Sequence, residues 1–167
     1  NDHQLNNSSQ CTSTSPSFPN HSSKGTEVSY SLKNPSGSSI SVLSWNVAGL
    51  REKLEDPGWL NFILPFDILC FQETWSLEES FPLPGFIQFI TTAVSSAHGR
   101  PRGGLGTFFR NSLILHSEKF GVIEDKNMDS ILFWHHKNQK CLLINIYIPS
   151  DPAQTNLLLE SLNITLS

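Results

Sequence analysis

A short apolar run that ends abruptly in a carboxylate constrains this chain more than any other feature of its sequence. Residues Ile68 to Phe71 are all apolar, with Asp67 before them and Gln72-Glu73-Thr74 directly after them. A run of this length between polar residues is typical of a strand that is buried on both faces. In an open α/β sheet the functional groups lie at the carboxyl ends of such strands. Glu73 is therefore a candidate ligand for a hard cation, although an isolated Glu is more often a solvated residue that begins a loop.

The residues before this run predict a strand–helix–strand unit. Ile40 to Trp45 is rich in residues that favour strands, and it leads into the polar Asn46 and a glycine-containing turn. Asp56-Pro57 is typical of a helix N-terminus, and apolar residues with helical spacing follow until Pro65. Two strands joined by such a helix indicate an α/β (α+β) fold, with a parallel or mixed sheet that helices cover.

The later part of the chain predicts short strands in hairpins and one final helix. The intervals between the apolar runs suit antiparallel pairs, so we expect mixed, largely antiparallel sheets. The helix is expected from Pro152 to about Leu162, because Asp151-Pro152 resembles a helix cap. The expected strands cover residues 86–90, 105–110, 113–115, 130–135 and 141–148, with a turn at 137–139.

Composition separates the first residues from the rest. Residues 1–39 are rich in Ser, Asn and Pro and poor in apolar residues, which predicts a disordered leader followed by one domain over residues 40–167. The net charge of −4 gives no general positive field for nucleic acid, although it leaves room for a local basic strip. No apolar stretch is long enough to span a bilayer, so no membrane partner is expected. Cys70 and Cys141 lie in apolar runs, which favours buried free thiols.

Three of the predicted strands end in polar side chains that suit one kind of site. Asn46 follows the first strand, Glu73 follows the buried strand, and Tyr147 lies near the end of the last one. If these strands are neighbours, an amide, a carboxylate and a phenol meet at one edge of the sheet. Such a set suits a divalent cation next to an anionic oxygen. Arg100, Arg102 and Arg110 are candidates for phosphate contacts, or for solvated surface charges.

Four motifs in the chain resemble, in order and spacing, those of the endonuclease/exonuclease/phosphatase superfamily. Within it they are most similar to the apurinic-like endonuclease domain of non-LTR retrotransposons. The resemblance implies a four-layer α/β/β/α sandwich, of which this chain would form the N-terminal part. The motifs are Ser44-Trp45-Asn46-Val47-Ala48-Gly49-Leu50, Asp67-Ile68-Leu69-Cys70-Phe71-Gln72-Glu73-Thr74, Gly103-Gly104-Leu105-Gly106 and Asn145-Ile146-Tyr147-Ile148-Pro149.

The resemblance also implies a chemistry and a role for each matching residue. It implies cleavage of a phosphodiester in DNA with Mg²⁺ or Mn²⁺, and by analogy a nuclear location. Glu73 resembles the family's metal ligand, and Asn46 resembles the amide that borders the metal and the phosphate. Tyr147 resembles the phenol that forms a hydrogen bond with the scissile phosphate. The cation would polarise the phosphoryl oxygen, and the phenol would add a preorganised donor.

Two departures from the family pattern limit this interpretation. Ala48 stands where many members have Asn or Asp, and it has no group that assists a metal ligand. Neither the Asp-x-Asn strand end nor the Ser-Asp-His sequence of the family's second half follows the fourth motif. We therefore expect a fragment that has no significant activity alone and exposes an apolar sheet face. An inositol-phosphate or lipid phosphatase and a non-enzymatic remnant are the alternatives.

Overall fold

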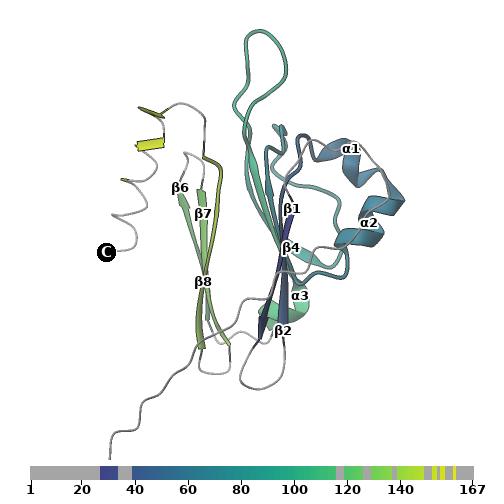
Figure 1. Ribbon diagram of the computed structural model, residues 1–167, viewed down its shortest axis with the longest axis vertical. Helices are drawn as coiled ribbons and strands as arrows, with labels where there is room; N and C mark the ends of the chain where they lie inside the picture. Colours follow the sequence, from purple (N-terminus) through teal and green to yellow (C-terminus); the bar gives the residue numbers. More distant parts are fainter. Residues whose placement is uncertain are drawn as a thin grey trace, which may run out of the picture.

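The chain folds into two facing sheets, with helices on the outer side of the larger one (Figure 1). The computed structural model describes residues 27–33, 39–115, 119–125, 129–136 and 139–148, together with Pro152, Ala153, Thr155, Asn156 and Glu160. The described part is therefore an α/β structure of helix, sheet and sheet, which agrees with part of the expected four-layer sandwich.

The larger sheet is mixed, as the strand–helix–strand pattern predicts. Its strands are β1 (Glu27–Lys33), β2 (Ser39–Asn46), β3 (Ile68–Gln72), β4 (Phe86–Thr91) and β5 (Leu105–Arg110), in the order β1-β2-β3-β5-β4. β2 and β3 are parallel, and all other neighbours in this sheet are antiparallel. The buried strand that ends before Glu73 thus lies in the middle of the sheet.

The second sheet is an antiparallel meander of three strands. It consists of β6 (Lys119–Asp125), β7 (Asp129–His136) and β8 (Gln139–Ile146), in that order. His136 of β7 pairs with Gln139 of β8, so two residues connect these strands and the predicted hairpin is confirmed. The connecting residues themselves lie outside the described part of the chain.

The helix between β2 and β3 forms where its capping signals predict. α1 (Arg51–Leu54) is a single turn, and α2 (Pro57–Ile63) follows it. The Asp56 carboxylate accepts hydrogen bonds from the backbone N–H groups of Gly58 at 2.8 Å and Trp59 at 3.4 Å. A side-chain cap of this type typically contributes about 1 kcal/mol to helix stability. The cap fixes the start of α2, and the helix returns the chain to β3.

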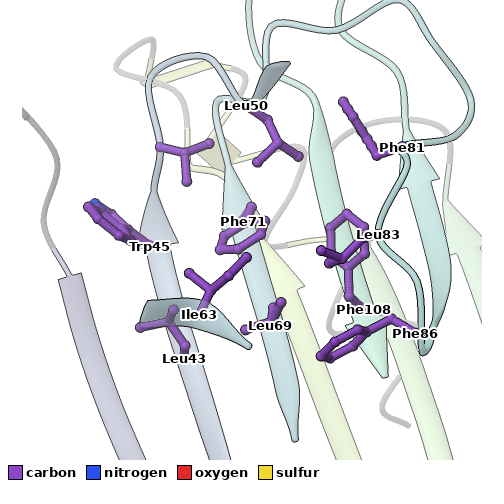
Figure 2. Close-up of a cluster of buried hydrophobic side chains, with 11 residues drawn as sticks. Leu43, Trp45, Leu50, Ile63, Leu69, Phe71, Phe81, Leu83, Phe86 and Phe108 are labelled. Carbon is purple, nitrogen blue, oxygen red and sulfur yellow. The ribbon is translucent and has the colours of Figure 1, made fainter. Parts of the chain in front are cut away.

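The main hydrophobic core lies between the larger sheet and its helices (Figure 2). Alternate residues of β2 and β3 face the helices, among them Leu43, Leu69 and Phe71, and the side chains of all three are fully buried. Ile63 of α2 and Phe108 of β5 complete the centre of this cluster. Each such side chain contributes roughly 1.5–3 kcal/mol when it leaves water.

The opposite face of β3 packs against the second sheet. Val42, Ile68, Cys70 and Phe109 form a second buried cluster, with Leu143 of β8 against it. The predicted exposure of an apolar sheet face is therefore wrong for these strands, because β7 and β8 of the second sheet pack against the larger sheet. Burial raises the pKa of the Cys70 thiol to about 12, so the prediction of a buried free thiol is confirmed for this residue.

The structure corrects two predicted segments and adds one strand. β1 lies within the segment expected to be disordered, and it forms because its backbone pairs antiparallel with β2. Residues 113–115, expected as a strand, belong to the helix α3 (Asn111–Leu115). Here β5 ends at Arg110, and the N–H of Asn111 donates to the Gly85 carbonyl at 2.9 Å. The strand β6 was not predicted.

The two ends of the chain are described only in part. Residues 1–26, predicted as the start of the leader, lie outside the described residues. Within the predicted helix at 152–162, the five residues that the structure describes are helical. Among the described helices, none combines the length and apolar character needed to cross a bilayer.

Candidate active site

A left-handed turn at the end of β3 brings Glu73 out of the sheet. The φ angles of Glu73 and Trp75 are 56° and 54°, a region that residues other than glycine rarely adopt. Each such residue costs of order 1–3 kcal/mol and persists only where its surroundings fix it. The Gly49 N–H donates to the Glu73 carbonyl at 2.8 Å, and the Leu50 N–H donates to the Thr74 carbonyl at 3.0 Å. The turn after β2 therefore holds one side of the Glu73 turn.

A glycine pair before β5 holds the other side. The N–H groups of Thr74 and Trp75 donate to the carbonyls of Gly104 at 3.2 Å and Gly103 at 3.0 Å. Gly104 has φ +86°, and a Cβ at this position would lie 2.4 Å from the Thr74 hydroxyl oxygen. Only glycine fits this approach without displacing its neighbours. The first and third sequence motifs thus act together to fix the second.

Three groups converge on the Glu73 carboxylate. Its Oε2 atom accepts hydrogen bonds from the Trp75 indole Nε1 at 2.5 Å and from the Gly103 N–H at 3.1 Å. The Tyr147 phenol also forms a hydrogen bond with this carboxylate. That bond, together with burial and the negative charge of Glu73, raises the pKa of Tyr147 to about 12, while the Arg102 charge acts in the opposite direction. Tyr147 is therefore a neutral hydrogen-bond donor at neutral pH.

The Glu73 carboxylate opens into a cleft of about 450 Å³ that carries two arginines. The Arg100 guanidinium lies over the Trp75 ring, 3.8 Å from its centroid. Both Arg100 and Arg102 are exposed, so their charges remain accessible to a ligand. The cleft is lined by Glu73, Trp75, His98, Gly99, Arg100, Arg102 and Tyr147.

A buried network between the two sheets determines where Tyr147 lies. The Gln72 amide donates to Asn145 Oδ1 at 2.7 Å, and the Asn145 amide donates to Thr107 Oγ1 at 2.8 Å. Asn145 is 2% exposed, and Thr107 is fully buried. These bonds fix the end of β8 against β3 and β5, two residues before Tyr147. The sequence did not indicate a role for Gln72 or Thr107, although each is a polar side chain in a largely apolar strand.

The structure brings together most of the residues predicted for the site. Glu73 and Tyr147 meet, and Arg100 and Arg102 line the same cleft. Asn46 lies at the end of β2, half-buried and paired in register with Gln72. Alternation along the strand places its side chain on the face that looks toward the second sheet. Asn46 is not among the residues that line the cleft, so its role as a metal-bordering amide stays a prediction.

Of the two alternatives for Arg110, the phosphate contact is wrong. This residue lies at the opposite end of β3 from Glu73, where its Nε atom is 3.6 Å from the Asp67 carboxylate. Its guanidinium also donates to the carbonyls of Leu64 and Phe66. Arg110 therefore binds the chain before β3, far along the strand from the cleft.

The cleft offers the kind of donor that Mg²⁺ or Mn²⁺ requires, in small number. Within the described residues, no group of three or more His, Cys, Asp and Glu side chains could hold a metal. Mg²⁺ keeps several of its waters and often uses only one or two carboxylates, so the single carboxylate of Glu73 meets this demand. Two N–H donors and a phenol around it are the outer contacts that orient a ligating carboxylate.

One comparison with known proteins bears on this arrangement. A family model described as the Endonuclease/Exonuclease/phosphatase family matches residues 43–156, more than half of the chain. A comparison with curated proteins gave no match. The matched range contains the end of β2, the Glu73 turn, the glycine pair and Tyr147.

Proposed function

Since the chain belongs to the endonuclease/exonuclease/phosphatase family, we propose that its cleft binds a divalent cation and a phosphodiester of DNA for cleavage. The proposed activity is the nicking of DNA by a retrotransposon-type endonuclease domain, which would act in the nucleus. The observation that carries this proposal is the convergence of Glu73, Tyr147, Arg100 and Arg102 in one cleft.

Each of these side chains has a part that its chemistry suits. Glu73 would hold Mg²⁺ or Mn²⁺, which when bound polarises a phosphoryl oxygen. Tyr147 keeps its proton at neutral pH, and its O–H, which forms a hydrogen bond with Glu73 here, would turn to a phosphate oxygen when that ligand is bound. Arg100 and Arg102 offset the negative charge of the phosphate and position it beside Glu73. Asn46 would border the cation only if its side chain turned from the inter-sheet face toward the cleft.

The choice of DNA over an inositol phosphate rests on the retrotransposon-like motifs and on the two arginines. Members of one fold can differ in substrate because function depends on the loops around the site. A DNA backbone presents a row of phosphates, which two exposed arginines on one rim can contact. The alternative substrate is an inositol phosphate, so the binding experiment must compare it with DNA.

The proposal is tested by measuring Mn²⁺ binding and DNA binding in the same chain. We expect saturable Mn²⁺ binding by calorimetry that falls at least about tenfold in Glu73→Gln, because the variant lacks the anionic ligand. Glu79→Gln is the matched control, since Glu79 is an exposed Glu outside the cleft. Fluorescence anisotropy with a short DNA duplex should show binding that Mn²⁺ strengthens and that Arg102→Ala weakens.

Several outcomes would contradict the proposal. Equal Mn²⁺ affinity in the wild type and in Glu73→Gln would remove Glu73 from the cation site. Tight binding of inositol hexakisphosphate, with no measurable binding of DNA, would favour the phosphatase alternative. If the chain bound neither DNA nor inositol hexakisphosphate, a non-enzymatic role would be favoured.

Turnover is expected to be harder to detect than binding. The described part of the cleft supplies a single carboxylate, so we expect little plasmid nicking by this chain with Mg²⁺. Clear nicking that disappears in Glu73→Ala would show instead that the chain holds every group the reaction needs.

A further inference from the structure

Trp75 contacts both the Glu73 carboxylate and the Arg100 guanidinium of the cleft. Its Nε1 atom lies 2.5 Å from Oε2 of Glu73, and Arg100 lies 3.8 Å from the ring centroid. Trp75 is half-buried and has no part in the family chemistry described above. Its contacts therefore need an explanation of their own.

The position of the indole ring is fixed by the turn after β2. A Cβ on Gly49 would lie 3.1 Å from Cε3 and 3.4 Å from Cζ3 of Trp75, so the backbone of Gly49 packs closely against the ring. Gly49 also has φ +100°, and its N–H donates to the Glu73 carbonyl. The same glycine thus supports both the ring and the backbone of the carboxylate that the ring contacts. With Arg100 also against it, little of the ring is left for stacking on a nucleic-acid base.

Other tryptophans of the chain show what a purely structural indole looks like here. Trp45 and Trp59 pack in the core, 5.8 Å apart between ring centroids. Their Nε1 atoms are buried and have no hydrogen-bond partner among the described residues. Trp75 differs from both, because its N–H is directed to an ionisable group inside the cleft.

We propose that Trp75 is a positioning residue that sets the Glu73 carboxylate and the Arg100 guanidinium in a fixed relation across one ring. Its N–H and that of Gly103 both bind Oε2 and so fix the rotation of the carboxylate. Its ring carries Arg100 by a cation–π contact, which orders an otherwise exposed side chain. The ligand that this pair fits is a divalent cation next to a phosphate group. This inference deepens the proposed function and rests on it for the identity of the two ligands.

The contact with Glu73 can be tested without any ligand. In a proton–nitrogen correlation spectrum, Trp75→Phe identifies the Trp75 indole signal by its loss. A short hydrogen bond to a carboxylate should place this proton downfield, and Glu73→Gln should move it upfield while the Trp59 indole signal stays in place. A Trp75 indole signal that does not respond to Glu73→Gln would overturn the proposal.

Measurements of Mn²⁺ and DNA affinity can separate the contact of Trp75 with Glu73 from its contact with Arg100. Trp75→Phe keeps an aromatic ring but removes the indole N–H. Mn²⁺ affinity should therefore fall about tenfold, as when an outer-shell partner of a metal ligand is lost. Trp75→Leu removes the ring as well, so DNA affinity should fall further than in Trp75→Phe. Trp59→Phe is the matched control, because it removes an indole N–H outside the cleft, and it should change neither affinity.

The outcomes distinguish this inference from the function on which it rests. Wild-type affinity for Mn²⁺ in Trp75→Phe, or equal DNA affinity in the Phe and Leu variants, would overturn the role of Trp75. A wild-type chain that does not bind Mn²⁺ counts against the proposed function. The indole signal then still decides whether Trp75 holds Glu73.

Discussion

The two ends of β3 carry two carboxylates that the fold uses in opposite ways. Asp67 precedes the strand and Glu73 follows it, and both are half-buried. Asp67 is enclosed by fixed partners: its Oδ2 atom accepts from the N–H and the hydroxyl of Ser41 at 2.9 and 2.7 Å. Arg110 approaches its other oxygen. At this end of the strand, the Asp67 carboxylate therefore has a structural role, because it holds Ser41 of β2 and Arg110 of β5 next to β3.

The Glu73 end is built from similar bonds but opens into the cleft. Glu73 also accepts two N–H groups, yet Tyr147, Arg100 and Arg102 around it face a shared volume rather than the sheet. The comparison teaches that a carboxylate beside an arginine is not by itself a sign of a site. The difference is that Glu73 follows the carboxyl end of β3, where the loops leave room for a ligand, whereas Asp67 precedes the amino end.

The largest effect is expected from two glycines that differ in crowding but not in backbone angle. Gly104, at the Glu73 end, has φ +86°, and Gly85, at the Asp67 end, has φ +85°. A Cβ at Gly85 meets no atom within 4 Å, whereas one at Gly104 lies 2.4 Å from Thr74 Oγ1. In urea denaturation, Gly85→Ala should cost about 1 kcal/mol, and Gly104→Ala about 3 kcal/mol because overpacking adds to the backbone strain. Equal losses would mean that the Glu73 turn adjusts freely.

The next effect tests the network that ties β8 to the Glu73 end. Asn145→Ala removes one hydrogen bond from the half-buried Gln72 amide and one from the buried Thr107 hydroxyl. The free energy of unfolding should fall by about 2 kcal/mol, because two hydrogen bonds of about 1 kcal/mol each are lost. The Tyr147 pKa should also fall toward its ordinary value, because the phenol is less firmly held against Glu73. Loss of stability with an unchanged Tyr147 titration would show that β8 is positioned by packing alone.

A pair of matched variants separates the two carboxylates directly. Asp67→Ala should lower the free energy of unfolding by about 2 kcal/mol, because it removes bonds to a charged group, and should leave Mn²⁺ affinity unchanged. Glu73→Gln should change stability by no more than about 0.5 kcal/mol, since the amide oxygen still accepts the two N–H groups. Its Mn²⁺ affinity should fall about tenfold, equivalent to about 1.4 kcal/mol. If both variants lost stability and neither lost affinity, the two ends would be equivalent.

The last effect, a pH dependence from Tyr147, is absent at neutral pH. Its pKa is raised from 10.0 to about 12, so the folded chain retains the phenol proton more tightly than the unfolded chain does. The resulting stabilisation is complete below pH 10 and is lost as the pH rises from 10 to 12. Phenolate absorbance, taken as the difference between the wild type and Tyr147→Phe without added cation, should show this midpoint. Glu73→Gln should move it back toward 10, because it removes the main cause.

The sequence by itself determined the elements whose signals are local. The apolar run of β3 and the Asp56-Pro57 cap of α2 act over a few neighbouring residues, and both form where the sequence predicts. A continuous apolar run and a helix cap are each visible in a few adjacent residues, so the sequence alone indicates them. Glu73 and Tyr147 were identified as site residues because each ends a strand within a recognisable motif.

Only the tertiary structure decided which polar groups meet. Gln72 and Asn145 are 73 residues apart in sequence, and no local pattern shows that they bind each other. The same holds for Arg110, which resembles Arg100 and Arg102 in sequence but lies at the Asp67 end. The position of β1 depends on its pairing with β2, and the position of the Trp75 ring depends on the close approach of Gly49. Long-range pairing depends on how separate elements pack, and that information is distributed over the whole chain rather than held in any one stretch.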